Sequence, residues 1–226
     1  MKGDKVYMDI LRKMKEYIYL LKEIRVYKSL FFHRGGDGIL LKNGWMSSKQ
    51  TNSIIDGKGN PIPWYTYSAI SFLNEYDLSA EEVFEWGSGY STFYYTDRVK
   101  SIRTVENNEK WYRKVKDKVA ERKHVTCLFR NSEEEYVRAI CENSENYSII
   151  VVDGEYREMC GKEAVDHLKS EGVIILDDSE RQEYSELKDY LLKKNFKSLN
   201  FWGIAAGISY LKCTSIYYRP NNIFNI

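Results

Sequence analysis

Residues 83–92, with the sequence VFEWGSGYST, place two closely spaced glycines between a carboxylate and several hydroxyls. Gly87 and Gly89 have no Cβ, so the backbone can turn tightly there and approach a ligand closely. The apolar residues before them indicate a strand. A helix starting at Tyr90 would offer free N–H groups and a positive dipole end to an anionic group. The stretch is a candidate ligand-binding turn; the alternative is a structural turn.

A second carboxylate, Glu106, ends the next apolar run and follows Gly87 by 19 residues. An acid in this place can accept hydrogen bonds from both hydroxyls of a ribose. Together with the glycine turn it predicts a nucleoside-bearing cofactor. The nicotinamide fingerprint would require glycine where Thr92 stands, and the chain has no phosphate loop of the GxxxxGK[S/T] type.

Carboxylates also end two later apolar runs. Asp153 follows SIIVV, and Asp177 and Asp178 follow GVIIL. Parallel strands end at a common rim of a sheet, so we expect the three side chains to lie close together. Three carboxylates with room for water suit Mg²⁺, which prefers oxygen ligands in an octahedron. The alternatives are that Asp153 acts as a base without metal and that Asp178 or Ser179 caps the following helix.

The run Glu85-x-Gly87-x-Gly89-x-Ser91 resembles the first motif of class I S-adenosylmethionine-dependent methyltransferases, with a serine replacing the third glycine often seen there. The resemblance covers about residues 81–218 and implies S-adenosylmethionine as cofactor. The turn would hold the methionine part, and Glu85 would brace the loop or meet the amino group. The implied cofactor-binding residues at the turn are Glu85, Gly87, Ser88, Gly89 and Ser91. Glu106 would bind the ribose, with Asn107 next to it in the chain. Asn131 or Ser132 would lie near the adenine, and Asp153 completes the set.

The aspartates resemble those of metal-dependent O-methyltransferases, in which acids ending these strands hold magnesium. The resemblance implies Asp153, Asp177 and Asp178 as Mg²⁺ ligands, with Asp153 and Asp178 as catalytic groups. It also implies a small molecule or a sugar or glycan hydroxyl as acceptor. The catechol pattern has a lysine just after Asp153, where Tyr156 and Arg157 stand, so the general base is not assigned. The Asn-Pro-Pro-Tyr motif of N-methyltransferases is missing, which favours oxygen. An NAD(P)-dependent oxidoreductase and a non-catalytic binding module are the alternatives.

From residue 81 onward, strand-type segments alternate with helical segments, and these elements must position the residues named above. Strand-type runs occur at 82–86, 101–105, 124–129, 148–152, 172–176, 196–201 and 208–218, and helical spacing at 108–122 and 180–194. Nearly all-apolar strands alternating with helices predict an α/β fold with a parallel sheet covered on both faces. The last two runs have no helix between them. We therefore expect a Rossmann-like, seven-stranded, mostly parallel sheet with an antiparallel last strand, plus an N-terminal helical cap.

Residues 1–80 are predicted to form the cap, and residues 81–226 the cofactor-binding domain. Apolar residues in 5–32 recur at steps of three and four, which predicts an amphipathic helix. This helix would pack on the rest of the chain or on a second copy as a homodimer; attachment to a membrane surface is the alternative. Residues 33–63 are rich in Gly, Asn and Ser and predict an irregular lid, followed by a short helix over 64–76.

Composition narrows the partners and the compartment. The chain of 226 residues has 34 Lys+Arg against 33 Asp+Glu. It therefore lacks the excess of basic residues that would indicate binding to nucleic acid. Its four cysteines, scattered without a CxxC, and the absence of histidines at ligand spacing argue against a zinc site or disulfide framework and for a reducing compartment. The N-terminal segment lacks the unbroken apolar core of a signal peptide or membrane span. We expect a cytoplasmic protein.

Overall fold

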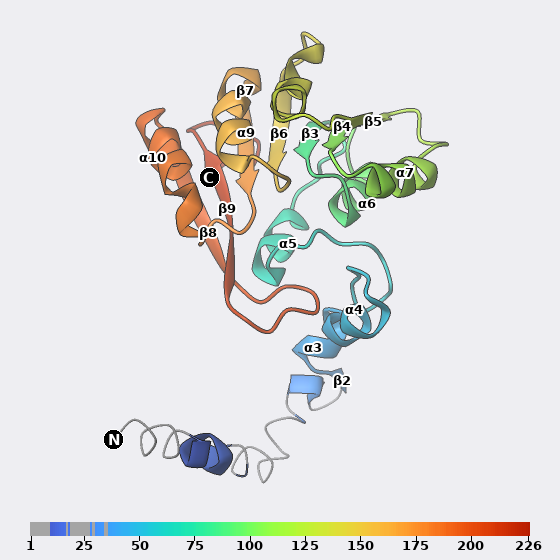
Figure 1. The fold of residues 1–226 in the computed structure, drawn as a ribbon, viewed down its shortest axis with the longest axis vertical. Coiled ribbons are helices and arrows are strands. Elements are labelled where there is room, and N and C mark those ends of the chain that lie inside the picture. Colours follow the sequence, from blue (N-terminus) through green and yellow to red (C-terminus); the bar gives the residue numbers. More distant parts are fainter. Residues whose placement is uncertain (1–9, 17, 19–27, 29, 34–35) are drawn as a thin grey trace.

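The computed structural model describes residues 10–16, 18, 28, 30–33 and 36–226. A seven-stranded sheet with helices on both faces forms its centre, with β5 and β8 at opposite edges (Figure 1). The strand order is β5-β4-β3-β6-β7-β9-β8; β9 is antiparallel to both neighbours, and the other pairs are parallel. The strands are β3 (Glu82–Trp86), β4 (Ser101–Glu106), β5 (Val125–Phe129), β6 (Tyr147–Val152), β7 (Leu168–Leu176), β8 (Lys197–Gly203) and β9 (Lys212–Tyr218).

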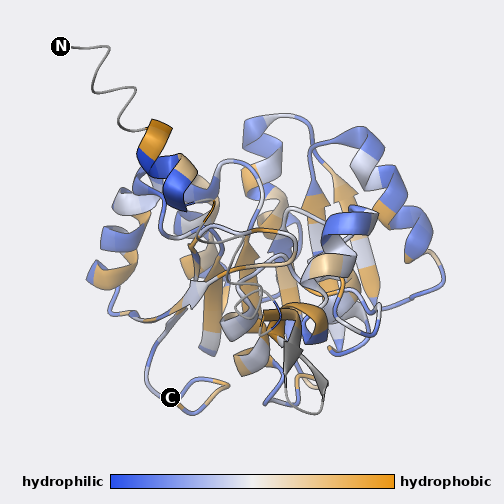
Figure 2. Cartoon of the chain, turned by 90° about the horizontal axis from the view of Figure 1, so that it is seen from below, coloured by the Kyte–Doolittle hydropathy of each residue, from blue (hydrophilic) through white to orange (hydrophobic). Residues whose placement is uncertain are grey.

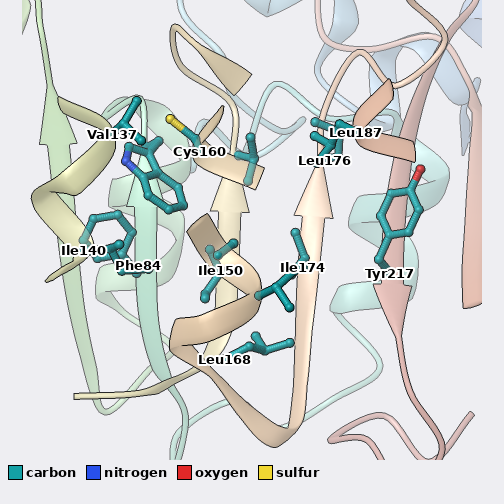
Figure 3. Packing of buried hydrophobic residues seen from close by; sticks show 14 of the residues in the cluster. Phe84, Val137, Ile140, Ile150, Cys160, Leu168, Ile174, Leu176, Leu187 and Tyr217 are labelled. Atoms are coloured by element: carbon teal, nitrogen blue, oxygen red, sulfur yellow. The ribbon is translucent and has the colours of Figure 1, made fainter. Parts of the chain in front are cut away.

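The central strands are apolar because both of their faces are covered. In β6, Ile150 and Val152 belong to one buried cluster, and Ile149 and Val151 belong to the cluster on the other face. Figure 3 shows the first cluster, in which side chains of β6 and β7 pack under residues such as Leu187. Figure 2 shows the same contrast, with mainly hydrophobic strands between helices that are largely hydrophilic. The sheet is thus a rigid support for the loops at its edge.

Helices and short 3-10 turns connect the strands. Thr66, Asn108 and Ser132 begin three of the helices by accepting a hydrogen bond from a backbone N–H in the first turn, as N-cap residues do. The helices are α3 (Ile39–Lys42), α4 (Trp45–Thr51), α5 (Tyr67–Leu73), α6 (Tyr90–Thr96), α7 (Glu109–Lys118), α8 (Glu133–Val137), α9 (Arg157–Ala164) and α10 (Ser185–Lys193), with 3-10 turns η1 (Arg138–Glu142), η2 (Val165–His167) and η3 (Gln182–Tyr184).

The predicted fold class is confirmed, including the antiparallel strands at the end of the chain. The prediction of an irregular segment at 33–63 was wrong for much of its length. It contains α3 and α4, and an isolated bridge joins Ile55 to Pro61. Ser48 in α4 holds this turn because its hydroxyl donates to the carbonyl of Ile55 and accepts from the N–H of the same residue. Short-range polar contacts of this kind leave no apolar periodicity in the sequence.

The N-terminal helix lies mostly outside the described residues. Residues 10–16, 18, 28 and 30–31 are helical. Ile10, Met14 and Ile18 from the apolar stripe are each about half exposed, at 51%, 55% and 50%. Packing of this helix on the rest of the chain or on a second copy stays a prediction. No helix in the described residues has the length and apolar character needed to cross a membrane.

Candidate functional site at the carboxyl ends of the strands

A cavity of about 470 Å³ opens where the parallel strands end. Its walls come from the turn between β3 and α6, the end of β4, the loops after β6 and β7, and the start of β9. The predicted residues that line it are Gly87, Ser88, Gly89, Ser91, Glu106, Asn107, Asp153, Asp177 and Asp178. The fold therefore brings most of the sequence-predicted site residues around one space. The predicted site residues Glu85, Asn131 and Ser132 do not line it.

The glycine turn is built against another loop. Gly87 has a φ of +94°, which favours glycine, and a Cβ added there would lie 2.7 Å from the Cα of Gly154. A Cβ on Gly154 would in turn meet the hydroxyl of Tyr136 at 1.9 Å. Gly87 is thus needed for close contact between two backbones, whereas the sequence suggested close approach to a ligand. A Cβ on Gly89 would meet only Trp111 at ordinary contact distance, so Gly89 leaves room on the cavity side.

Glu85 lies beneath the turn and is completely buried. Its Oε2 accepts hydrogen bonds from the hydroxyls of Thr92 at 2.5 Å and Thr104 at 2.9 Å. Thr92 Oγ1 also accepts from the N–H of Gly89, so the carboxylate supports the turn through this hydroxyl. Burial raises the pKa of Glu85 to about 7, although nearby hydroxyls offset part of the effect. The other oxygen, Oε1, has no hydrogen-bond partner among the described residues. This arrangement favours the bracing role over contact with a cofactor amino group.

Glu106 ends β4 and faces the cavity with its carboxylate fixed in place. Its Oε1 accepts from the N–H groups of Asn107 at 3.0 Å and Asn108 at 2.9 Å. Its Oε2 accepts one longer bond, at 3.3 Å, from the hydroxyl of Ser88. Burial raises the pKa of Glu106, and these bonds offset part of the rise. Each carboxylate oxygen has two lone pairs, so Oε2 keeps the capacity to accept from a ligand hydroxyl.

Aromatic residues that the sequence did not single out also line the cavity, and two of them, Trp111 and Tyr136, lie beside the glycine turn and the loop after β6. Trp111 in α7 donates from its indole Nε1 to the carbonyl of Ser88 at 2.6 Å. Tyr136 in α8 lies at Gly154. The two residues predicted near an adenine lie elsewhere: Asn131 is exposed, and Ser132 caps α8. An aromatic residue near the start of the helix after an acid-ended strand is a signal that could have indicated Trp111.

The loops after β6 and β7 are joined by Arg157. Its guanidinium donates to the carbonyls of Gly154 at 2.9 Å, Asp153 at 3.0 Å and Asp177 at 2.7 Å. It also forms ion pairs with the carboxylates of Asp153 at 3.1 Å and Asp178 at 3.3 Å. Sequence reasoning treated this arginine as a departure from the catechol pattern. The structure shows that it holds the two acidic loops together.

Lys212 begins β9 and lies between the two adjacent aspartates. Its ammonium is 2.6 Å from Asp177 Oδ2, 2.7 Å from Asp178 Oδ1 and 3.0 Å from the carbonyl of Trp64. The three N–H donors of this group therefore have three acceptors. Only 3% of the lysine side chain is exposed. Thr214 donates to Asp177 Oδ1 at 2.6 Å, so both oxygens of Asp177 are occupied by the protein.

The carboxylates differ in their ionisation. Burial raises the pKa of Asp153 to about 6 and that of Asp177 to about 7, against the lowering effect of nearby cations. Burial acts in the same direction on Asp178, but Lys212, Arg157 and Arg181 outweigh it and keep its pKa below the usual value. Asp178 also has a φ of +52°, an uncommon backbone conformation for a residue other than glycine. The ion pairs of Asp178 hold it in this conformation.

The prediction of a magnesium site receives no support from this arrangement. In the described part of the chain, the oxygen atoms of the three aspartates do not form a set within 4.8 Å of one another. Lys212 and Arg157 occupy the positions between the carboxylates, where a cation would be needed. The alternative to the metal site, in which Asp178 or Ser179 caps the next helix, does not hold either. Ser179 bonds to Cys213 and Ser215, and α10 begins at Ser185.

Comparison with known proteins gives matches among solved structures. No family model and no curated protein matches the chain. A precorrin-6y C5,15-methyltransferase from Geobacter metallireducens is 14% identical, with a TM-score of 0.53 over 67% of this chain and 87% of its own. A methyltransferase-like protein from Silicibacter pomeroyi is 16% identical, with a TM-score of 0.53 over 71% and 89%. A methyltransferase from Pyrococcus furiosus is 14% identical, with a TM-score of 0.51 over 81% and 96%. The chain therefore has the fold of the class I S-adenosylmethionine-dependent methyltransferases.

Proposed function

We propose that the protein is an S-adenosylmethionine-dependent methyltransferase that methylates a hydroxyl of a small molecule or a glycan. The observation that carries the proposal is the cavity at the carboxyl ends of the strands. It combines the glycine turn with a buried carboxylate, Glu106, whose Oε2 can still accept hydrogen bonds. This combination suits a ligand with a ribose, and the fold is one in which such cofactors bind at this edge of the sheet.

The residues on this side of the cavity fit the cofactor. Glu106 would bind the ribose hydroxyls, and Asn107 and Trp111 would lie beside the nucleoside, because all three line the cavity together. Gly89 and Ser91 would meet the methionine part, where the absence of a Cβ at Gly89 leaves space. When bound, the cofactor would supply an electrophilic methyl group on sulfur. The contribution of the chain is to align the acceptor and to exclude water from it.

Asp153 is the group in this chain best suited to accept the proton of an acceptor hydroxyl. It lines the cavity, and its pKa of about 6 leaves it ionised but still basic near neutral pH. Arg157 holds its carboxylate at 3.1 Å and fixes its direction. Asp177 is a poorer candidate because Lys212 and Thr214 already occupy its oxygens. Asp178 would act through its charge, by keeping Lys212 and Arg157 in position.

The acceptor side of the cavity has an aromatic rim. Trp64 is 48% exposed, yet its indole Nε1 donates to the carbonyl of Ala206 at 2.9 Å, so its ring is held in place. Tyr210 is 62% exposed and lines the same cavity. Exposed aromatic rings at the rim of a cavity can stack on a sugar or on an aromatic ring. They support a small molecule or glycan as acceptor.

Calorimetric titration with S-adenosylmethionine and with NAD⁺ separates the proposal from the oxidoreductase alternative. Binding of the former and not of the latter is expected. Release of S-adenosylhomocysteine on addition of hydroxyl-bearing sugars and phenols would then separate an enzyme from a non-catalytic module. Binding of NAD⁺ alone would overturn the proposal. An Asp153→Asn variant that binds the cofactor normally but turns over slowly would support Asp153 as the base.

A further inference from the structure

A second group of reactive side chains lies away from the cavity. Cys141 belongs to η1, Glu163 to the last turn of α9, and His167 to η2. The sequence separates Cys141 from Glu163 and His167 by 22 and 26 residues, so no short sequence motif contains all three. The fold nevertheless brings the three side chains together. All three are partly buried, with 32% of the Glu163 side chain and 21% of the His167 side chain exposed.

The distances within the group match those between the ligands of a tetrahedral metal ion. Cys141 Sγ lies 3.1 Å from Glu163 Oε1 and 3.4 Å from His167 Nε2, and the last two atoms are 3.6 Å apart. Zinc binds sulfur at about 2.3 Å and nitrogen or oxygen at about 2.0–2.2 Å, so its tetrahedral ligand atoms are roughly 3.4–3.6 Å apart. Only a small movement of the thiol from the carboxylate would complete the geometry.

We propose that Cys141, Glu163 and His167 form a binding site for a zinc-type divalent ion. Thiolate, imidazole and carboxylate are the ligand types that Zn²⁺ takes, whereas Mg²⁺ prefers oxygen alone. On binding, the thiol proton of Cys141 passes to solvent and the sulfur forms the bond to the metal. Three protein ligands leave the fourth tetrahedral position for water or for a group from another molecule.

The surroundings favour entry of a cation. Among the ion pairs of the described residues, Glu163 pairs with His167 and with no lysine or arginine. Glu163 also lines an open groove of about 530 Å³. Two basic side chains, Arg138 and Lys162, line the same groove, and Lys162 already pairs with Glu158. The carboxylates that line it are more numerous: Glu133, Glu134, Glu163 and Asp166.

The group is separate from the candidate active site. His167 directly precedes β7, and Asp177 directly follows it, so the nine residues of this strand lie between them. Beside β6, Leu168 lies opposite Tyr147 and Leu176 lies opposite Val152, so the two ends of β7 are five residue steps of β6 apart, roughly 17 Å at about 3.3 Å per residue. A metal here would link η1 to the end of α9 and to η2. Its expected effect is on stability and not on the acidic rim. The proposal is thus independent of the methyltransferase function.

Cobalt is the probe of choice because Co²⁺ takes the same tetrahedral geometry and absorbs visible light. Titration of the reduced, metal-free protein with Co²⁺ should give a thiolate-to-cobalt band in the near ultraviolet that saturates at one ion per chain. Zn²⁺ should remove the band by replacement and should raise the melting temperature. The matched control is Cys127→Ser. Cys127 is also partly buried, and burial raises the pKa of both thiols to about 11.

The band should persist in Cys127→Ser and disappear in Cys141→Ser and His167→Gln. A measurement on the unaltered chain covers the case in which these variants fail to fold. Zn²⁺ should slow the alkylation of Cys141, read by peptide mass spectrometry, at least tenfold more than that of Cys127. Absence of a cobalt band, a band that survives Cys141→Ser in the folded protein, or equal protection of the two thiols would overturn the proposal. The contacts would then be a local hydrogen-bond network.

Discussion

The two sides of the cavity satisfy their carboxylates in opposite ways. On the turn side, made of Glu85, the glycine turn and Glu106, the carboxylate that lines the cavity keeps unused capacity: Glu106 Oε2 accepts one long bond, whereas Glu85 is completely buried beneath the turn. On the aspartate side, made of Asp153, Asp177 and Asp178, lysine and arginine approach every carboxylate within 3.3 Å. The turn side therefore keeps a free hydrogen-bond acceptor, whereas the carboxylates of the aspartate side are paired within the protein.

This difference indicates a division of tasks. A buried polar group without a partner costs free energy, and a ligand that supplies the partner recovers it. The turn side is therefore organised to gain a ligand. The aspartate side already contains its own counter-ions, so its charges keep their arrangement with or without a ligand.

The largest effect is expected from Lys212→Met. The change leaves Asp177 and Asp178 buried without their central cation, and breaking a buried ion pair from one side costs about 3–5 kcal/mol of unfolding free energy. Urea unfolding at pH 8 measures the loss. Lys188→Met is the control, since Lys188 on α10 donates to the carbonyl of Ser179 and not to a carboxylate. A loss of less than about 1 kcal/mol for Lys212→Met would show that the aspartate side does not depend on its internal cation.

The next effect concerns pH and the turn side. The pKa of Glu85 is raised from 4.5 to about 7, so the folded protein holds this proton more tightly than the unfolded chain. Its stabilising effect is full below pH 4.5 and is lost as the pH rises through about 7, a change of about 3 kcal/mol. Glu85→Gln should lack this change. Urea unfolding of both proteins at pH 4.5 and pH 8 isolates it, because the shifts of Asp153 and Asp177 occur in both. Parallel pH profiles would contradict the burial effect.

A smaller effect is expected from Glu106→Ala on cofactor binding. Hydrogen bonds to a charged group contribute about 1.5–3 kcal/mol, so the dissociation constant for S-adenosylmethionine should rise at least about tenfold. Isothermal titration calorimetry measures it. Glu109→Ala is the control, because Glu109 begins α7 three residues later but forms an exposed pair with Arg113. Unchanged affinity in Glu106→Ala would remove the carboxylate from the binding site and weaken the contrast between the two sides.

The smallest effect is expected from magnesium. If the ion pairs with Lys212 and Arg157 already neutralise the aspartates, Mg²⁺ should leave the melting temperature of the protein and its rate of methyl transfer unchanged. The proposed site at Cys141 does not interfere, because thiolate and imidazole are poor ligands for Mg²⁺. Differential scanning fluorimetry with and without the ion tests the first point, and the assay of S-adenosylhomocysteine release tests the second. A saturable stabilisation by Mg²⁺ would restore the three aspartates as a metal site.

Local patterns were sufficient to predict most of the sheet. The apolar runs at 82–86 and 148–152 became strands with nearly the predicted bounds, because a strand covered on both faces must be apolar throughout. Glu106 and Asp153 could be placed at the cavity because each follows such a run. The candidate site was predictable to the extent that it depends on strand ends.

The residues that the sequence missed depend on long-range register. Lys212 meets Asp177 because β9 runs antiparallel to β7, which pairs Leu176 with Ser215, and no local pattern contains that pairing. One signal was present: a lysine at the start of a strand that is otherwise apolar or hydroxyl-bearing requires a buried partner. Cys141, Glu163 and His167 show the same limit. Their spacing argued against a metal site, yet the chain brings them together across η1, α9 and η2.

The backbone contact between Gly87 and Gly154 has a consequence for how the two sides are placed. The N–H of Asp153 donates to the carbonyl of Trp86 and so joins the loop after β6 to the end of β3, while the N–H of Gly87 donates to Val105 in β4. This bond and the close backbone contact hold the loops after β3 and β6 against one another. The contact thus fixes the distance between the glycine turn and Asp153, the proposed base, so that a ligand bound at the turn meets this carboxylate at a set position.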